Sequence, residues 1–494
     1  MDSSTAWQTL RERVVDLSAI NGIEGLLHWD QQVTMPRGGV SARGRQMALL
    51  AAVQHERVTD PRLREALDAA TATTPNERAA IRRLRREVDR AVRTPASLVR
   101  RLAAAQAEGH AAWVGARESE DFSGFAAPLS ELLRLNRELV AATRTDQADP
   151  YDVLLERYDP GSTVRELDPM FARLAAGLGD LLGRLDGRPH PEGFTGTWSV
   201  AEQKGLHAAV VRDMGFDLDE HGRLDDSVHP FTVGLDPTDV RLTHHLYADK
   251  LLSGLGGTIH EAGHGLYEQG LPTQLADIGL ATPAGYGLHE SQSRFWENAI
   301  GRSQPFSVYL RRQMGAHLSG PLPTAEQIFG ASNRVERSLI RVFADEVTYN
   351  LHIIVRYRLE RALFSGELPV AELPGAWDEL YGEVVGIRPS KPTDGVLQDV
   401  HWSSGLLAYF PSYTLGNLYA ASFAATMEAE LPQMWAQVEQ GQFGEILGWL
   451  RRKVHARGHS ADAPEIVRDA VGERDHVADL LASFERRHGV LYGV

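Results

Sequence analysis

The sequence contains no cysteine among its 494 residues. Disulfide bonds are therefore excluded, and so are a cysteine nucleophile and a metal site built from thiolates. Any metal ion in this protein would have to be held by His, Asp or Glu side chains.

Long apolar runs are also absent. No segment approaches the ~20 consecutive apolar residues that a membrane-spanning helix needs. The first residues, Met1-Asp2-Ser3-Ser4, lack the basic segment and the following apolar run of a signal peptide. We therefore expect a cytoplasmic protein with no membrane partner.

Positive charge is in short supply. There are 51 basic residues against 66 acidic ones, which gives a net charge of −15. An acidic surface disfavours a nucleic-acid partner. The chain is nevertheless 43% hydrophobic, which is ample for a large core, and its length alone would suggest more than one domain.

Most of the chain shows the three- and four-residue apolar spacing of amphipathic helices. Residues 215–243 differ, because short β-rich runs alternate there with Gly, Asp and Pro. These runs predict a small antiparallel sheet directly before a helical segment at about residues 246–269. Helical periodicity then resumes, with one long periodic stretch over residues 325–364.

The segment His260-Glu261-Ala262-Gly263-His264 lies within the predicted helix at 246–269. Residues four apart share one face of a helix, so the imidazoles of His260 and His264 can bind one ion. Glu261 stands beside them and can reach a metal-bound water. This pattern is typical of metal-dependent peptide hydrolysis.

Five glycines surround this motif, at positions 254, 256, 257, 263 and 265. Each glycine costs a helix interior up to about 1 kcal/mol relative to alanine. Such a cluster indicates close packing at a site, and it argues against two histidines on an ordinary amphipathic helix.

A catalytic zinc site needs a third protein ligand and an open position for water. The segment Gly287–Glu297 follows the second histidine at a spacing that suits a loop and a return helix. On residue type alone, Glu290, Glu297 and His289 all compete for this role. His289 equally suits a core or helix-cap position.

Several further motifs stand in order along the chain, and together they resemble the carboxypeptidase Taq family of zinc metallocarboxypeptidases. The family's H-E-S-Q, D-x-R-x-T, I-R-x-x-A-D and G-x-x-Q-D-x-H-W elements appear at His289–Gln292, Asp239–Thr243, Ile340–Asp345 and Gly395–Trp402. A family-like His-Trp-Asp-Gln-Gln element stands at residues 28–32, and His229-Pro230-Phe231 precedes the second of the four motifs.

The resemblance implies a mainly α, large helical zinc-peptidase fold around a deep groove, similar to that of neurolysin, with the small antiparallel β-sheet near the metal helix. We expect a single metallocarboxypeptidase domain over residues 1–494. Its helical N-terminal part would cover about residues 1–210, its metal and catalytic part about 211–425, and its C-terminal helices about 426–494. Because family members commonly form homodimers, a homodimer is also expected.

The resemblance assigns the third metal ligand to Glu290, beside His260 and His264. These residues would hold one Zn²⁺ per chain, and Co²⁺ can substitute in such a site. Glu261 would accept the proton of the metal-bound water and later pass it to the leaving amine, as general base and then acid.

Donors to the tetrahedral oxyanion are implied by analogy with the similar helical peptidases, which use a histidine and a tyrosine after the metal ligands. His401 together with Tyr413 or Tyr409 fits this role. Each tyrosine could instead be a buried aromatic residue with a satisfied hydroxyl group.

An enzyme that acts from the C-terminus must recognise a free carboxylate, and arginine does this best through its bidentate fork. Arg241 and Arg341, which lie in separate family motifs, are the candidates. Arg341 could instead form a helical i,i+4 ion pair with Asp345. Gln398 is a further candidate, for binding the substrate backbone.

Together these features predict a zinc metallocarboxypeptidase that hydrolyses C-terminal residues from peptides with a free C-terminus through a metal-activated water. A first alternative is a zinc endopeptidase or dipeptidyl carboxypeptidase of the same helical architecture. A second is a non-catalytic peptide-binding protein with a vestigial metal site. Intact Glu261 argues against the second, because a scaffold has no need of a general base.

Overall fold

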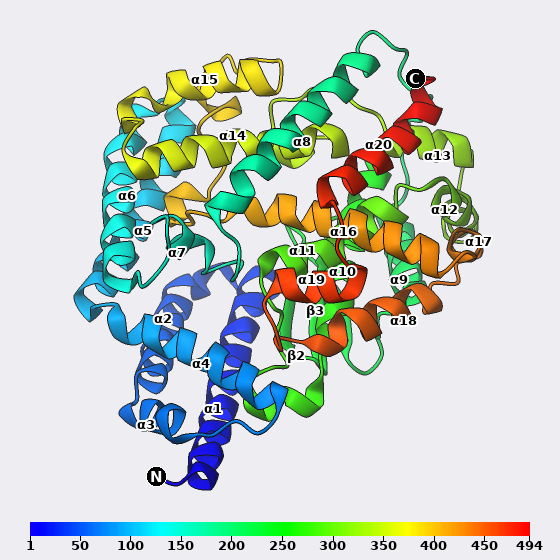
Figure 1. The fold of residues 1–494 in the computed structure, drawn as a ribbon. Coiled ribbons are helices and arrows are strands. Elements are labelled where there is room, and N and C mark those ends of the chain that lie inside the picture. The colour runs from blue at the N-terminus through cyan, green and yellow to red at the C-terminus, as the bar shows by residue number, and fades with distance from the viewer. The chain divides into compact units, whose positions relative to one another are not determined.

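The computed structural model describes all residues from Met1 to Val494. As the sequence predicts, the protein is built mainly of helices with one small sheet (Figure 1). None of its helices combines the length and the apolar character needed to cross a bilayer. The chain divides into two compact units, each assembled from three separate segments. The single domain over residues 1–494 stays a prediction.

Unit 1 comprises residues 1–92, 192–332 and 419–474. Its helices and strands are α1 (Ser3–Val33), α2 (Val40–Val58), α3 (Pro61–Ala69), α4 (Pro75–Arg93), α9 (Val200–Asp213), β1 (Gly222–Asp226), β2 (Thr232–Asp236), β3 (Asp239–His244), α10 (Leu251–Gln269), α11 (Tyr286–Arg294), α12 (Gln304–His317), α13 (Ala325–Ser332), α17 (Met434–Gln440), α18 (Gly444–Lys453) and α19 (Ala463–Val471).

Unit 2 comprises residues 93–191, 333–418 and 475–494. Its helices are α5 (Ala96–Ser119), α6 (Ser123–Thr143), α7 (Asp152–Leu155), α8 (Val164–Leu185), α14 (Glu346–Ser365), α15 (Leu373–Val384) and α20 (His476–Tyr492). Helix α16 (Phe410–Glu430) begins in unit 2 and ends in unit 1.

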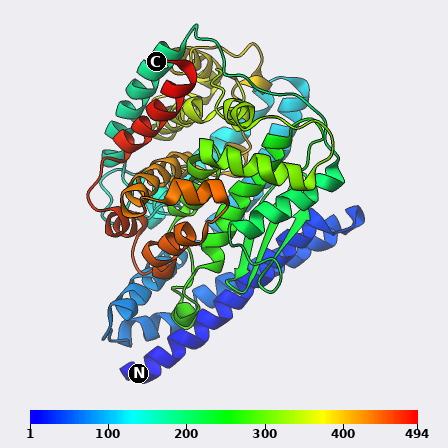
Figure 2. The same ribbon diagram turned by 90° about the vertical axis from the view of Figure 1, so that its right-hand side faces the viewer.

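Helix α1 supplies part of the hydrophobic core at one end of unit 1. Its apolar residues recur every three or four positions, and this stripe packs against α3 and α4 in a common core. Further along, α1 runs beside the sheet (Figure 2). Gly25 permits this approach, because a Cβ atom there would lie 2.7 Å from the side chain of Leu235 on β2.

The three strands form a mixed sheet in the order β1-β3-β2. β2 and β3 form an antiparallel hairpin, as predicted, but β1 runs parallel to β3. The structure thus corrects the expectation of a wholly antiparallel sheet. After β1 the chain leaves one strand position empty and forms β2. The hairpin then places β3 in that position, between β1 and β2. The central strand β3 buries Val240 and Leu242.

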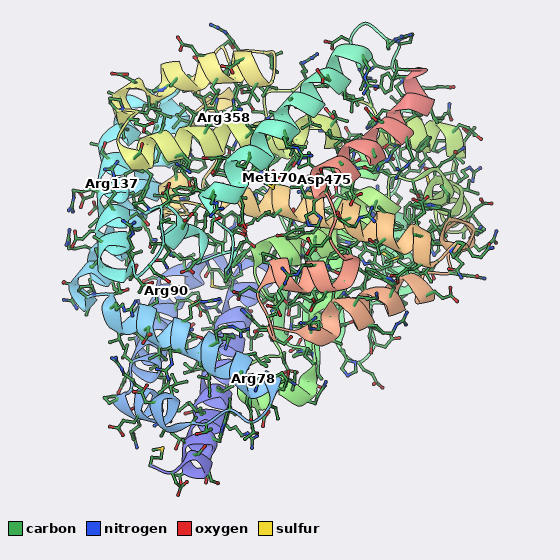
Figure 3. The ribbon with its side chains drawn as sticks, in the orientation of Figure 1. Arg78, Arg90, Arg137, Met170, Arg358 and Asp475 are labelled. Carbon is green, nitrogen blue, oxygen red and sulfur yellow. The ribbon has the colours of Figure 1, made fainter.

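Helix α14 of unit 2 buries 15 of its 20 residues, polar ones as well as apolar ones. Its N-terminus is capped by Asp345, which accepts hydrogen bonds from backbone N–H groups of the first turn. At its other end, Arg137 of α6 (Figure 3) donates to the carbonyl groups of Leu363 and Phe364. Both helix ends therefore have partners for backbone groups that the helix itself leaves unbonded.

The periodic stretch at 325–364 does not form one helix, contrary to its apolar spacing. Helix α13 ends at Ser332, a short 3₁₀ turn named η4 covers Arg341–Phe343, and α14 begins at Glu346. Since Asp345 serves as the cap of α14, Arg341 lies outside any helix that contains Asp345. The i,i+4 ion pair between Arg341 and Asp345 is therefore not formed.

Candidate functional site

Three side chains converge on one point in unit 1. His260 and His264 lie one turn apart on α10, and Glu290 lies on α11. Glu290 Oε2 is 3.6 Å from His260 Nε2 and 3.4 Å from His264 Nε2. The three ligand atoms all lie within 4.8 Å of one another. This spacing suits one ion held by two imidazoles and a carboxylate.

The second nitrogen of each imidazole is already occupied by a hydrogen-bond acceptor. His260 Nδ1–H donates to Glu297 Oε2 over 2.8 Å, and His264 Nδ1–H donates to the carbonyl oxygen of His289 over 3.1 Å. A protonated Nδ1 leaves the lone pair on Nε2, which faces Glu290 in both rings. The donor set therefore fits a metal ion in tautomer as well as in spacing.

The three residues that compete on residue type have different places in the structure. Glu297 lies on a π-helical turn, η3 (Phe295–Ile300), and its carboxylate contacts the Nδ1 side of His260. His289 Nε2–H donates to Glu268 over 2.8 Å, and its ring stacks on His264 with 4.4 Å between the ring centres. Only Glu290 of the three directs an oxygen into the cluster.

Arg294 holds the two carboxylates of this cluster in their ionised form. Its Nε donates to Glu290 over 2.6 Å, and its Nη1 lies 3.3 Å from Glu297. Burial works to raise the pKa of Glu290, but Arg294 and the nearby histidines outweigh it and hold this pKa well below the usual range. Burial also works to raise the pKa of Glu297, but Arg294 and His260 outweigh it and lower this pKa to about 2.

Glu261 is 8% exposed and is positioned by the sheet. The hydroxyl group of Thr232 on β2 lies 2.7 Å from Glu261 Oε2 and can donate to it. Burial raises the pKa of the Glu261 carboxyl above its ordinary value. A raised pKa strengthens a carboxylate as a proton acceptor, as a general base requires.

Close packing around the motif is confirmed at two of the glycines. A Cβ atom on Gly263 would lie 2.6 Å from the backbone oxygen of Gln292, so this glycine lets α10 and α11 approach. A Cβ atom on Gly265 would lie 2.7 Å from the side chain of Leu242 on β3. Gly256, in contrast, faces open space.

We expect Gly263→Ala to lower both the melting temperature and the metal content of the purified protein. The new methyl group would force apart the two helices that carry His264 and Glu290, and such overpacking typically costs about 1–3 kcal/mol. Gly256→Ala is the matched control on the same helix. It should keep the metal and gain up to about 1 kcal/mol of stability from helix propensity. Equal behaviour of the two variants would show that the packing at Gly263 does not position the ligands.

A second group of candidate residues gathers in unit 2 around Asp399. Arg341 donates to Asp399 Oδ1 through Nε and Nη2, over 2.9 and 2.8 Å, and its Nη1 donates to the hydroxyl of Tyr349. Arg356, which is fully buried on α14, donates to Asp399 Oδ2 over 2.5 Å. Two guanidinium groups thus share one carboxylate, and this buried group carries an excess positive charge.

His401 lies beside this charge cluster. Its Nε2 is 3.2 Å from the hydroxyl of Tyr413, and its ring also packs against Tyr409 with 5.5 Å between the ring centres. Burial lowers the pKa of His401 to about 4, with Arg341 and Arg356 acting in the same direction and Asp399 opposing them. A neutral imidazole bonded to a phenol therefore stands at this place at neutral pH.

Arg241 on β3 is fixed from two sides. Its guanidinium donates to Asp239 over 2.9 and 2.8 Å and lies 4.8 Å from the centre of the Trp29 ring. Arg223, its neighbour across the sheet, lies at the same distance from that ring. The tryptophan of the N-terminal family-like element therefore stacks with two arginines.

The side chain of Gln398 forms hydrogen bonds with backbone groups of its own unit. Its amide oxygen accepts from the N–H of Arg341, and its amide nitrogen donates to the carbonyl groups of Leu339 and Asp394. These bonds fix the loop that carries Arg341. A role in binding the substrate backbone stays a prediction.

The structure therefore places the candidates in two groups. His260, His264, Glu261 and Glu290 form the cluster in unit 1, and Arg241 lies in the same unit. The group in unit 2 comprises Arg341, Gln398, His401, Tyr409 and Tyr413. Sequence reasoning missed Arg356, since nothing in its local pattern distinguishes it from an exposed helical arginine.

Comparisons with known proteins agree along the whole chain. Residues 9–488 match the sequence profile described as carboxypeptidase Taq (M32) metallopeptidase. A relative from Thermus thermophilus, named thermostable carboxypeptidase 1, is 40% identical over 100% of both chains. Carboxypeptidase 1 of Bacillus subtilis is 34% identical over 94% of this chain and 95% of its own.

Solved structures show the same likeness. The M32 carboxypeptidase from Deinococcus radiodurans has a TM-score of 0.94 and 35% identity, covering 99% of this chain and 100% of its own. A carboxypeptidase structure from Pyrococcus furiosus has a TM-score of 0.94 and 29% identity, covering 98% of this chain and 99% of its own.

Proposed function

Because the chain belongs to the carboxypeptidase Taq (M32) family and is a metallocarboxypeptidase, a hydrolase, we propose that His260, His264 and Glu290 bind its metal ion as Zn²⁺. The observation that carries this proposal is the convergence of two Nε2 lone pairs on one carboxylate oxygen. Bound there, Zn²⁺ would polarise the scissile carbonyl group and lower the pKa of a bound water toward 7.

Glu261 is proposed to accept the proton of the attacking water and to deliver it to the leaving amine. Its position next to His260, its burial and its raised pKa support this role. The Thr232 hydroxyl group leaves the second carboxylate oxygen of Glu261 available for the water. Release of the amine then ends the cycle with the carboxylate ionised again.

His401 and Tyr413 are proposed as hydrogen-bond donors to the oxyanion of the tetrahedral intermediate. Their direct contact of 3.2 Å supports Tyr413 ahead of Tyr409, which reaches His401 by ring packing. Since burial keeps the His401 imidazole neutral, this ring adds no positive charge to the resting site.

Arg341 and Arg241 are proposed to recognise the free C-terminal carboxylate of the peptide. The excess positive charge of Arg341 and Arg356 over Asp399 favours an anionic group near Arg341. At Arg241, Asp239 and Trp29 hold the guanidinium in one orientation, so little side-chain entropy is lost when it binds.

Amidation of the peptide C-terminus is expected to reduce kcat/KM by roughly 30- to 150-fold. A carboxylate clamped bidentately in a partly dry site contributes ~2–3 kcal/mol, and each 1.36 kcal/mol is tenfold in rate. The measurement compares free-acid and amidated forms of one peptide with the parent enzyme.

Two variants control this comparison. Arg241→Met or Arg341→Met should cause a similar loss of kcat/KM on the free-acid peptide and little further loss on the amide. The two enzymes and two peptides form a double-mutant cycle, in which general damage to the fold cancels. If the parent enzyme cleaves both peptides equally well, the alternative of a zinc endopeptidase takes the place of the carboxypeptidase proposal.

We further propose, on the family resemblance, that the protein acts in the cytoplasm as a homodimer. Sedimentation equilibrium should then give twice the chain mass of 54.4 kDa. A species at the mass of one chain across micromolar concentrations would contradict the dimer.

A further inference from the structure

We infer that Glu360 is a positioning residue of this reaction, because its buried carboxylate fixes the segment 401–409 that begins at His401. This inference rests on the roles proposed above for His401 and Tyr413. No motif contains Glu360, and its place on α14 gives no sign of function in the sequence.

The Glu360 carboxylate is fully buried and accepts three hydrogen bonds. Its Oε1 accepts from the hydroxyl of Tyr151, over 2.5 Å, and from the backbone N–H of Ala408. Its Oε2 accepts from Trp402 Nε1–H over 2.7 Å. Two of the three donors thus belong to the segment 401–409, one next to His401 and one next to Tyr409.

The backbone of this segment needs such support. Ala408 has φ +64°, a left-handed conformation that residues with a Cβ atom rarely adopt. The turn before it, η7 (Trp402–Ser404), ends at Gly405, which has φ +68°. The bond from the Ala408 N–H to Glu360 opposes relaxation of this strained backbone, which would displace the tyrosine that follows.

Only a carboxylate can serve all three donors. A glutamine at this position offers one oxygen and one NH₂ group. With the oxygen toward Ala408 and Tyr151, the NH₂ group faces the indole N–H of Trp402. With the amide reversed, it faces the N–H of Ala408. In either orientation one buried N–H of the segment loses its acceptor.

The carboxylate is unfavourable for stability on other grounds. Its three partners are neutral donors, and burial raises its pKa to about 7 in spite of them. A buried acid without a cationic partner costs desolvation free energy. The arrangement is therefore better explained by the geometry that it imposes on the segment than by a gain in stability.

The test compares Glu360→Gln with the matched control Tyr151→Phe. The control removes a bond to the same carboxylate, but from a donor outside the segment. We expect Glu360→Gln to lower kcat by about 10- to 100-fold with KM within about threefold and metal content unchanged. Tyr151→Phe should keep kcat within about threefold of the parent, because both donors of the segment keep their acceptor.

Trp402→Phe keeps the test decisive if Glu360→Gln does not fold. It removes one of the segment's two donors and leaves the carboxylate in place, so kcat should again fall with little change in KM. Parent-like kcat in the folded glutamine or phenylalanine variant would overturn the inference, and so would an equal loss in Tyr151→Phe. His401→Gln is measured in parallel: if it retains full activity, the proposed function of His401 fails instead.

Discussion

Glu261→Gln is expected to reduce turnover by at least ~100-fold while the metal stays bound, because the substitution removes the proton acceptor and leaves His260, His264 and Glu290 in place. The amide has almost the same volume as the carboxylate. It can still accept the hydrogen bond from Thr232, so the position of the side chain should be retained.

The variant is assayed for peptide hydrolysis and for metal content in the same preparation. Full metal content with lost activity separates a chemical role from a ligand role. Activity within tenfold of the parent would contradict the assignment, since a general base contributes at least ~100-fold.

Glu290→Ala is expected to abolish tight metal binding, whereas Glu297→Ala should only weaken it. The first change removes the single carboxylate oxygen that faces both Nε2 atoms. The second removes the acceptor that orients His260, and losses of such outer partners typically weaken metal affinity by roughly 10- to 100-fold.

Metal titration of both variants distinguishes these outcomes. Glu297→Ala should reach one ion per chain at higher zinc concentration, and Glu290→Ala should not saturate. Because both residues pair with Arg294, the loss of an ion pair is common to the two variants and cancels in the comparison. Identical titration curves would overturn the choice of Glu290 as the ligand.

The convergence of His260 and His264 on α10 is the part that the sequence predicts best. Two histidines four apart share a helix face whatever surrounds them, so their convergence follows from helix geometry alone. The third candidate ligand is different, because Glu290 and Glu297 are both acidic residues on one return segment. Glu297 lies on a π-helical turn, which changes the face that it presents relative to Glu290, and no residue pattern signals such a turn.

The arginines show the limit of local reasoning. Arg341 and Asp345 have the spacing of a helical ion pair, but the helix starts at the aspartate, which caps it. Likewise Arg356 and Glu360 look like an ordinary exposed i,i+4 pair. In the fold each has a distant partner instead, Asp399 for the arginine and Trp402 for the glutamate. Burial on most faces of a helix is a property of the assembled unit, which spacing does not reveal.

Metal-dependent release of one C-terminal residue can be measured on an N-terminally blocked tripeptide with a free C-terminus, with and without a metal chelator. We expect release of the single C-terminal amino acid, loss of this release in chelator, and recovery when Zn²⁺ is restored. Release of a C-terminal dipeptide, or release that continues unchanged in chelator, would contradict this expectation.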